Sequence, residues 1–151
     1  KFHPTQQADN RSMTPEEYAV THLSPEVNEF AGLREKIGWG QTNLEMARTS
    51  LANSLFHVSI RHQEVLIAMG RVVGDGAMFF YIQDVIVDPD YQKQGLGHII
   101  MENIETYLQQ ATQKGSTVGL LAARGKEAFY RRYGYLDRSG DDLGLGMCKF
   151  L

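Results

Sequence analysis

The stretch from Asp84 to Leu108 constrains the fold of this chain more than any other, and it reads DVIVDPDYQKQGLGHIIMENIETYL. It begins as an apolar strand, passes through a proline and a Gly-x-Gly turn, and continues as a helix with apolar residues at helical spacing. Glycine lets a backbone approach a ligand closely, and the first N–H groups of a helix are unpaired at the positive end of its dipole. The stretch therefore predicts an anion site, often one for a phosphate.

Composition narrows the classes of protein to which the chain can belong. Its 151 residues fit one domain, and 42% hydrophobic with 22% charged residues is typical of a soluble globular protein. A net charge of -3 without a Lys/Arg cluster argues against a nucleic-acid partner, and no apolar run approaches the roughly 18 residues of a membrane span. Cys148 is the single cysteine, so we expect no internal disulfide and a cytoplasmic location. The five histidines share no spacing that implies a metal site.

The first part of the chain predicts one strand and two helices. Residues 16–23 have strand character, and Ser24 then fits a helix N-cap with Pro25 at the first helical position. Gly38 stops this helix, and a capping box over Thr42–Glu45 begins the next one. One side of the first helix comprises Val27, Phe30, Ala31, Arg34 and Ile37.

The rest of the chain predicts a sheet and two further helices. Three strands follow in close order with short turns between them, which is typical of an antiparallel meander: they span 55–61, 64–73 and 79–87. After the long helix come a buried strand, a short helix that Gly134 closes, and a final strand, at 117–123, 125–135 and 145–151. The order predicts a mixed α+β domain without repeats or a second core.

The glycine turn does not match the commonest phosphate motifs. A P-loop motif is absent, and the dinucleotide fingerprint G-x-G-x-x-G lacks its third glycine, because His98, Ile99 and Ile100 follow Gly97. What stands between the strand and the helix is Gln92-x-x-Gly95-x-Gly97. A bare G-x-G also occurs in ordinary tight turns, so the neighbouring residues have to decide between the two interpretations.

Those neighbours resemble a known family. V-x-P-x-Y-Q-x-x-G-x-G after a hydrophobic strand resembles motif A of the GNAT superfamily, the acetyl-CoA-dependent N-acetyltransferases, and AFYRRYGY resembles motif B. LREKIGWG and GRVVGDGAMFFYIQDVIVDP are similar to small bacterial members that also resemble plant serotonin N-acetyltransferases. The first residues are polar and show no periodicity, which predicts a flexible lead-in at 1–14, and the resemblance implies one acetyltransferase domain at 15–151. It further implies an α+β fold with a mixed, mostly antiparallel sheet, flanked by helices and splayed at the central strands to hold acetyl-CoA.

The resemblance also implies which residues bind the cofactor. Backbone N–H groups of the turn would hold the pyrophosphate of coenzyme A, and the preceding strand would offer main-chain groups to the pantetheine arm. These residues are Val85, Ile86, Val87, Gln92, Lys93, Gln94, Gly95, Leu96, Gly97 and His98. Many members carry an asparagine after the fifth strand that contacts the cofactor, and this chain lacks it. Arg124 or Lys126 could meet a phosphate of the cofactor instead, or both could simply be exposed.

Two residues are the main candidates for proton transfer. Tyr130 matches the family's general acid by its spacing to Gly134, although an amphipathic core tyrosine is the alternative. Asp84 stands in a hydrophobic run, where a carboxylate is costly unless it is paired or used, so it is either the base or a structural residue. Strand alternation predicts its side chain on the face of Ile82. His57 is a further candidate base, but as a lone histidine on a strand it is better explained by packing.

The acceptor is less well defined by the sequence. The resemblance implies a site between the first helix pair, the meander and the C-terminal segment, with Trp39, Phe56 and Tyr81 as lining residues. We expect the primary amine of a small molecule. A protein or peptide amine, or a non-catalytic acyl-CoA-binding module, are the alternatives. Similar subgroup members pair as dimers, so the resemblance implies a homodimer. From the charge, the histidine spacing and the lack of a long apolar run we expect no nucleic-acid, metal or membrane partner.

Overall fold

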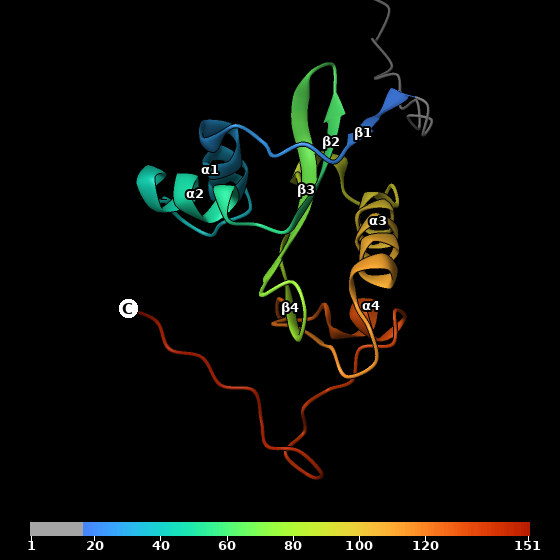
Figure 1. Cartoon of the computed structure of the whole chain (residues 1–151). Coiled ribbons are helices and arrows are strands. Elements are labelled where there is room, and N and C mark those ends of the chain that lie inside the picture. The colour runs from blue at the N-terminus through green and yellow to red at the C-terminus, as the bar shows by residue number, and fades with distance from the viewer. Residues whose placement is uncertain (1–16) are drawn as a thin grey trace, which may run out of the picture. The chain divides into compact units, whose positions relative to one another are not determined.

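The computed structural model describes residues 17–151, so the predicted lead-in at 1–14 lies outside the described residues. Contacts divide the chain after Val118 into two units. Residues 17–118 form the described part of the first unit, and Gly119–Leu151 form the second. Figure 1 shows the elements of both units.

A five-stranded sheet organises the first unit, with its strands in chain order from β1 to β5, and the boundary at Val118 falls within β5. The strands are β1 (Ala19–Thr21), β2 (Phe56–His62), β3 (Val65–Gly74), β4 (Phe79–Val87) and β5 (Thr117–Leu120). The pairs β1–β2, β2–β3 and β3–β4 are antiparallel, which confirms the predicted meander. Thr117 N–H donates to the Met78 carbonyl at 2.7 Å. Because β5 therefore starts beside the start of β4, the two run parallel, and the sheet is mixed but mostly antiparallel, as expected.

Helices lie on both faces of this sheet (Figure 1). They are α1 (Val27–Lys36) and α2 (Leu44–Ala52) on one face and α3 (Leu96–Ala111) on the other. The α1–α2 face has a core of Phe30, Leu33, Ala47 and Leu51 packed on Leu66, Met69 and Ile86. On the opposite face α3 lies close to Gly70, where an added Cβ would stand 2.6 Å from Ile100 Cγ2. The absence of a side chain at this position lets the helix approach the sheet.

A β-bulge interrupts the pairing of β3 with β4. Met69 pairs with Ile86 and Arg71 pairs with Gln83, so Gly70 faces two residues of β4 instead of one. The extra residue belongs to the segment Asp84–Val85. Asp84 has a φ of 54°, a left-handed conformation that is uncommon for any residue except glycine. The bulge therefore stands in the strand that the sequence assigned to the cofactor.

The bulge corrects the predicted direction of one candidate residue. Ile82 pairs with Val72, two residues beyond Gly70, and so lies on the α3 face. Asp84 instead bonds Arg34 of α1 and lies on the opposite face. Simple strand alternation, which placed Asp84 with Ile82, is wrong here because the bulge changes the face that the strand presents.

The two helix starts differ from their predictions. The first helix begins at Val27 with Glu26 as N-cap, and the Glu26 N–H donates to Glu29 Oε1 at 2.8 Å. Glu29 lies three residues after the N-cap Glu26, as in a capping box, so Ser24 is not the cap. In α2 the N-cap is Asn43, whose Oδ1 accepts the Met46 N–H at 3.0 Å. An asparagine next to Thr42 is an equally good cap, and the register of the helix decides between them.

The second unit contains one short helix, α4 (Glu127–Arg131). Gly134 has a φ of 87° just beyond it, consistent with the predicted helix end. Arg131 pairs with Asp137 through two hydrogen bonds of 2.8 and 2.7 Å. The predicted final strand is wrong, since no strand follows β5 among residues 17–151. Met147 is 93% exposed, so this segment has the apolar composition of a strand without a partner strand to pair with.

Candidate functional site

Ion pairs and a short turn fix the connection between β4 and α3. The 3-10 turn η2 (Pro89–Tyr91) follows Asp88, whose carboxylate accepts the Asp90 N–H at 2.9 Å. The Tyr91 N–H donates to the Asp88 carbonyl at 2.8 Å. Lys36 Nζ lies 2.7 Å from the other oxygen of the Asp88 side chain, so α1 holds the start of the turn in place.

The glycine turn itself has an open outer side. Lys93 and Gly95 have positive φ angles of 63° and 80°, and Gly95 is the N-cap of α3. A Cβ built at Gly95 would meet nothing within 4 Å, so the glycine is needed for its backbone conformation and not for close packing. The helical ladder starts with Ile99 N–H donating to the Gly95 carbonyl, and the first turn carries no acidic residue. Backbone donors at the positive end of α3 are therefore placed to receive an anion.

The edge of β4 beside this turn presents main-chain groups. Asp88 N–H donates to the Ile67 carbonyl of β3 at 2.8 Å. Because backbone groups alternate along an extended strand, the N–H groups of Val85 and Val87 point away from β3. The Val87 carbonyl accepts the side chain of Gln92 at 3.3 Å.

Strand β5 is too short to cover this edge. It has four residues and begins beside Met78, at the far end of β4 from Val87. Within residues 17–151 no other strand continues the sheet past β4. An extended ligand can therefore bind along the Val85–Val87 edge through main-chain hydrogen bonds, in the way that an additional strand would.

Asp84 is a buried charge held from two sides. The residue is 2% exposed, and its Oδ2 accepts Arg71 Nε at 2.7 Å while its Oδ1 accepts Arg34 Nη1. Gln83 Nε2 also donates to Oδ1, at 3.3 Å. Both carboxylate oxygens are engaged, so taking a proton from a substrate would weaken a buried ion pair. Of the two roles that the sequence left open for Asp84, these contacts favour the structural one.

Arg34 joins Asp84 to the loop between α1 and α2. Its Nε donates to Thr42 Oγ1 at 3.2 Å, and its guanidinium carbon lies 5.0 Å from the centre of the Trp39 ring. Trp39 is 41% exposed, so one part of its ring faces solvent. Sequence reasoning missed Arg34 and Arg71 as site residues. The signal was a charged residue on the apolar side of the first helix and another within an apolar strand.

His57 lies on the same face of the sheet as Asp84, because it pairs with Arg71. Its Nε2 lies 3.1 Å from the Leu51 carbonyl, which can only accept, so this nitrogen carries the proton. Its Nδ1 is buried and has no hydrogen-bond partner among the described residues. Burial lowers the pKa of His57, with Arg71 acting in the same direction, so the ring is neutral at pH 7. The result is a neutral imidazole with an unused acceptor nitrogen.

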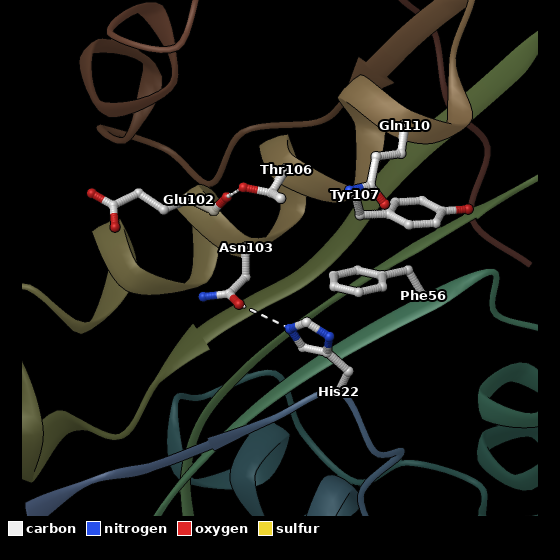
Figure 2. A pocket seen from close by; sticks show the side chains of 7 residues that line it. All are labelled: His22, Phe56, Glu102, Asn103, Thr106, Tyr107 and Gln110. Atoms are coloured by element: carbon white, nitrogen blue, oxygen red, sulfur yellow. Dashed lines mark hydrogen bonds between the residues drawn. The ribbon is translucent and has the colours of Figure 1, made fainter. Parts of the chain in front are cut away.

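The predicted acceptor residues do not share one face. Phe56 stacks on Tyr107 of α3, with ring centres 4.5 Å apart and planes 6° from parallel. Figure 2 shows both rings lining a pocket on the α3 face, together with the hydrogen bond between His22 and Asn103. The pocket has a volume of about 390 Å³, and His22 Nε2 lies 2.9 Å from Asn103 Oδ1. Tyr81 pairs with Val73, two residues beyond Arg71, and so faces the α1–α2 side together with Trp39. The structure therefore groups Tyr81 with Trp39 and separates Phe56 from them.

In the second unit, Tyr130 belongs to a cluster of aromatic rings. Its ring lies edge-on to Phe129 and Tyr135, with centres 5.1 and 6.5 Å away. Arg124 and Lys126 are exposed, and Lys126 is the N-cap of α4. The ring of Tyr130 thus packs against two aromatic neighbours, and two exposed cations, Arg124 and Lys126, precede it in sequence.

Residues 17–151 lack two kinds of feature. No group of three or more His, Cys, Asp or Glu residues is close enough to hold a metal ion. No helix there has the length and apolar character that a membrane span requires.

Comparisons with known proteins agree with this geometry. Residues 19–143 match the model of the acetyltransferase (GNAT) domain. A histone acetyltransferase, TAP1 of Glycine max, is 33% identical over 73% of this chain. The chain covers 52% of that protein and between 50% and 70% of the first curated relatives.

Solved structures extend the likeness to the fold. A Staphylococcus aureus protein of unknown function, described as a probable acetyltransferase, has a TM-score of 0.80 and 32% identity, covering 87% of this chain and 99% of that one. N-acetylglutamate synthase of Neisseria gonorrhoeae, solved with coenzyme A and L-arginine, is similar in fold alone, with a TM-score of 0.62, 17% identity, and 83% and 29% of the two chains covered. From the match to the family model and the similarity of these relatives, the chain belongs to the GNAT acetyltransferase family.

Proposed function

We propose that this chain is an acetyl-CoA-dependent N-acetyltransferase that acetylates the primary amine of a small molecule. One observation carries the proposal: the bulged strand β4 has an open edge at Val85–Val87 and leads directly into the glycine turn at the start of α3. An extended arm that ends in a pyrophosphate matches both parts at once. Family membership gives the class of reaction, and the small-molecule acceptor goes beyond it.

The residues of the first unit fit such a cofactor. The turn from Gln92 to His98 offers backbone N–H groups and the positive end of α3 to the pyrophosphate. The N–H groups of Val85 and Val87 would bond the amide groups of the pantetheine arm. Acetyl-CoA supplies a thioester whose carbonyl carbon an amine can attack. An N–H of the Val85–Val87 segment is then the natural donor to the oxygen on which negative charge develops.

The second unit would supply the acid. We assign Tyr130 to protonate, or donate a hydrogen bond to, the departing thiolate, because its spacing to Gly134 matches the family's motif B. Arg124 or Lys126 would meet a phosphate of the cofactor. Both assignments rest on sequence and on the position of these residues within their own unit.

For the base, the contacts favour His57 over Asp84. The amine must lose a proton, directly or through water, before or during attack. His57 has a neutral ring and an unused Nδ1, whereas both oxygens of Asp84 bond arginines. We therefore assign proton acceptance to His57 and the support of the bulge to Asp84.

The acceptor is proposed to bind on the α1–α2 face. Trp39 and Tyr81 lie on that side, and aromatic rings suit the apolar part of an arylalkylamine. The likeness to a named histone acetyltransferase supports a protein amine as the second candidate. Resemblance to dimeric subgroup members supports a homodimer, and the single exposed Cys148 is consistent with a reducing compartment such as the cytoplasm.

The test is thiol release from acetyl-CoA across a panel of small arylalkylamines, aliphatic amines and histone-tail peptides. We expect turnover with at least one small amine and little with the peptides. A matched variant, Gly97→Val, should weaken acetyl-CoA binding by more than about tenfold, because its side chain obstructs approach to the turn. Turnover with peptides alone would favour the second candidate, and unchanged calorimetric affinity in folded Gly97→Val would remove the cofactor assignment.

A further inference from the structure

Arg34 contacts Trp39 and Thr42 in the loop that follows its own helix, and also Asp84, which lies 50 residues further along the chain. We propose that Arg34 is a positioning residue that couples the α1–α2 loop, residues 37–43, to the bulge in β4. An acceptor that binds next to Trp39 would then change the position of the Val85–Val87 segment, which contacts the thioester. This inference rests on the proposed function and adds to it a device by which acceptor binding affects the reacting end of the cofactor.

The contact with the bulge is a buried ion pair. Arg34 Nη1 bonds Asp84, whose side chain has no exposed surface, and Asp84 directly precedes the Val85–Val87 segment. Asp84 also has a left-handed backbone that its surroundings must hold in place. A movement of the Arg34 guanidinium would therefore displace Asp84, and with it the adjacent Val85–Val87 segment.

The contact with the loop involves both side chain and backbone. Trp39 stacks over the guanidinium at 5.0 Å, Thr42 accepts its Nε, and Trp39 N–H donates to the Arg34 carbonyl at 3.0 Å. Gly38 and Gly40 flank the tryptophan with φ angles of 89° and 76°. Glycines on both sides allow the backbone to turn around Trp39, while Arg34 holds the ring.

The chemistry of these contacts requires arginine. A guanidinium can bond a carboxylate with one nitrogen, a hydroxyl with another, and stack its flat face on an indole at the same time. A lysine ammonium could satisfy only part of this set. Arg71 provides the internal comparison, because it bonds the other oxygen of Asp84 and also Ser54 Oγ, at 3.0 Å, but makes its aromatic contact with Phe30 and not with the loop.

The coupling can be measured without any turnover, because Trp39 is the single tryptophan of the chain. Acrylamide quenching of its fluorescence reports how exposed the ring is. We expect Arg34→Gln to raise the quenching constant about twofold, since one face of the indole loses its cation. Asp84→Asn should raise it as well, although Asp84 does not touch Trp39. Arg48→Gln is the control, because Arg48 lies on α2 with its side chain 63% exposed and 3.7 Å from Glu45.

A second variant guards against loss of folding in Asp84→Asn. Thr42→Val removes the bond to Arg34 Nε and leaves the buried ion pair intact. We expect higher quenching together with an acceptor KM raised about threefold and an unchanged affinity for acetyl-CoA, as for the loss of a single hydrogen bond. Arg34→Lys should fail to restore the wild-type quenching constant.

The outcomes separate this inference from the proposed function. Unchanged quenching in folded Asp84→Asn, or in Thr42→Val if the first variant does not fold, would overturn the coupling. Absence of thiol release with every amine would remove the proposed function and leave the fluorescence result standing. Normal turnover with unaltered quenching in the variants would remove the coupling alone.

Discussion

The two faces of the sheet in the first unit differ in what they bury. On the α3 face the contacts are apolar and close, with Gly70 beneath Ile100 and Ile104. On the α1–α2 face an apolar core stands next to a buried carboxylate held by two arginines. Apolar packing needs only shape, whereas a buried charge needs each partner in place. We infer that the α3 face mainly stabilises the fold. The α1–α2 face contains buried charges in place of some apolar packing, and we infer that these charges serve the functional site.

The largest expected effect is on the charged face. Asp84→Ala would leave Arg71 buried without its carboxylate and should lower the free energy of unfolding by about 3–5 kcal/mol. Chemical denaturation measures it, with Asp90→Ala as the control because the Asp90 side chain is 75% exposed. A loss no larger than that of the control would mean that the ion pair does not hold this face together.

The next prediction concerns activity on the same face. His57→Gln should lower turnover about 100-fold, the lower end of the range for general acid–base catalysis. In wild type the rate should rise with pH as the amine and His57 lose protons. In His57→Gln the part of this rise that is due to titration of the imidazole should be absent. The measurement is a pH–rate profile with one good amine, with the profile of Asp84→Asn beside it. A profile altered in Asp84→Asn but not in His57→Gln would return the base role to Asp84.

The same histidine also predicts a dependence of stability on pH. Burial lowers the pKa of His57, so the folded state favours the neutral ring. The unfolded chain takes up a proton as the pH falls through its ordinary value of about 6.5, and the stability that His57 contributes is lost over that range. His57→Gln should flatten the dependence of the denaturation midpoint on pH below about pH 6.5, where unfolded His57 takes up its proton.

A smaller effect is expected from the packed face. Gly70→Ala places a Cβ 2.6 Å from Ile100 Cγ2 and should cost about 1–3 kcal/mol of stability, while turnover per folded molecule stays near wild type. Gly32→Ala is the matched control. It lies within α1 with nothing within 4 Å of an added Cβ, and it should gain roughly 0.5–1 kcal/mol. Loss of turnover in folded Gly70→Ala would break the division of roles between the two faces.

The smallest effect should come from a half-exposed ion pair that joins α1 to β2. Arg61 bonds both oxygens of Glu29, and this hydrogen bonding lowers the pKa of Glu29. A lowered carboxyl pKa gives stability above its unfolded value that is lost as the pH falls through the folded one. Solvent screens the pair, so Glu29→Gln should change the free energy of unfolding by less than about 1 kcal/mol at pH 7, and still less at pH 3. A larger change would show that this pair belongs with the buried network.

Local patterns predicted most of the elements. Strand β4 spans the predicted residues 79–87, and the apolar residues of α3 have the predicted helical spacing, since both patterns depend only on neighbouring residues. The helix starts were less well predicted, because Ser24, Glu26 and Asn43 all offer capping groups and packing selects among them. The strand predicted at 145–151 failed for a related reason, because a strand requires a partner that its own residues cannot specify.

The sequence by itself determined the strand, the glycine turn and the helix that follow one another from Asp84 onward, and with them the family resemblance. These features depend on backbone conformations that glycine, proline and spacing impose locally. Only the tertiary structure decided what Asp84 does and which aromatic residues lie together. One extra residue in β4 turns Asp84 toward Arg34 and Arg71, and pairing with β3 places Phe56 and Tyr81 on opposite faces. Register and bulges come from contacts between distant strands, which no local pattern specifies.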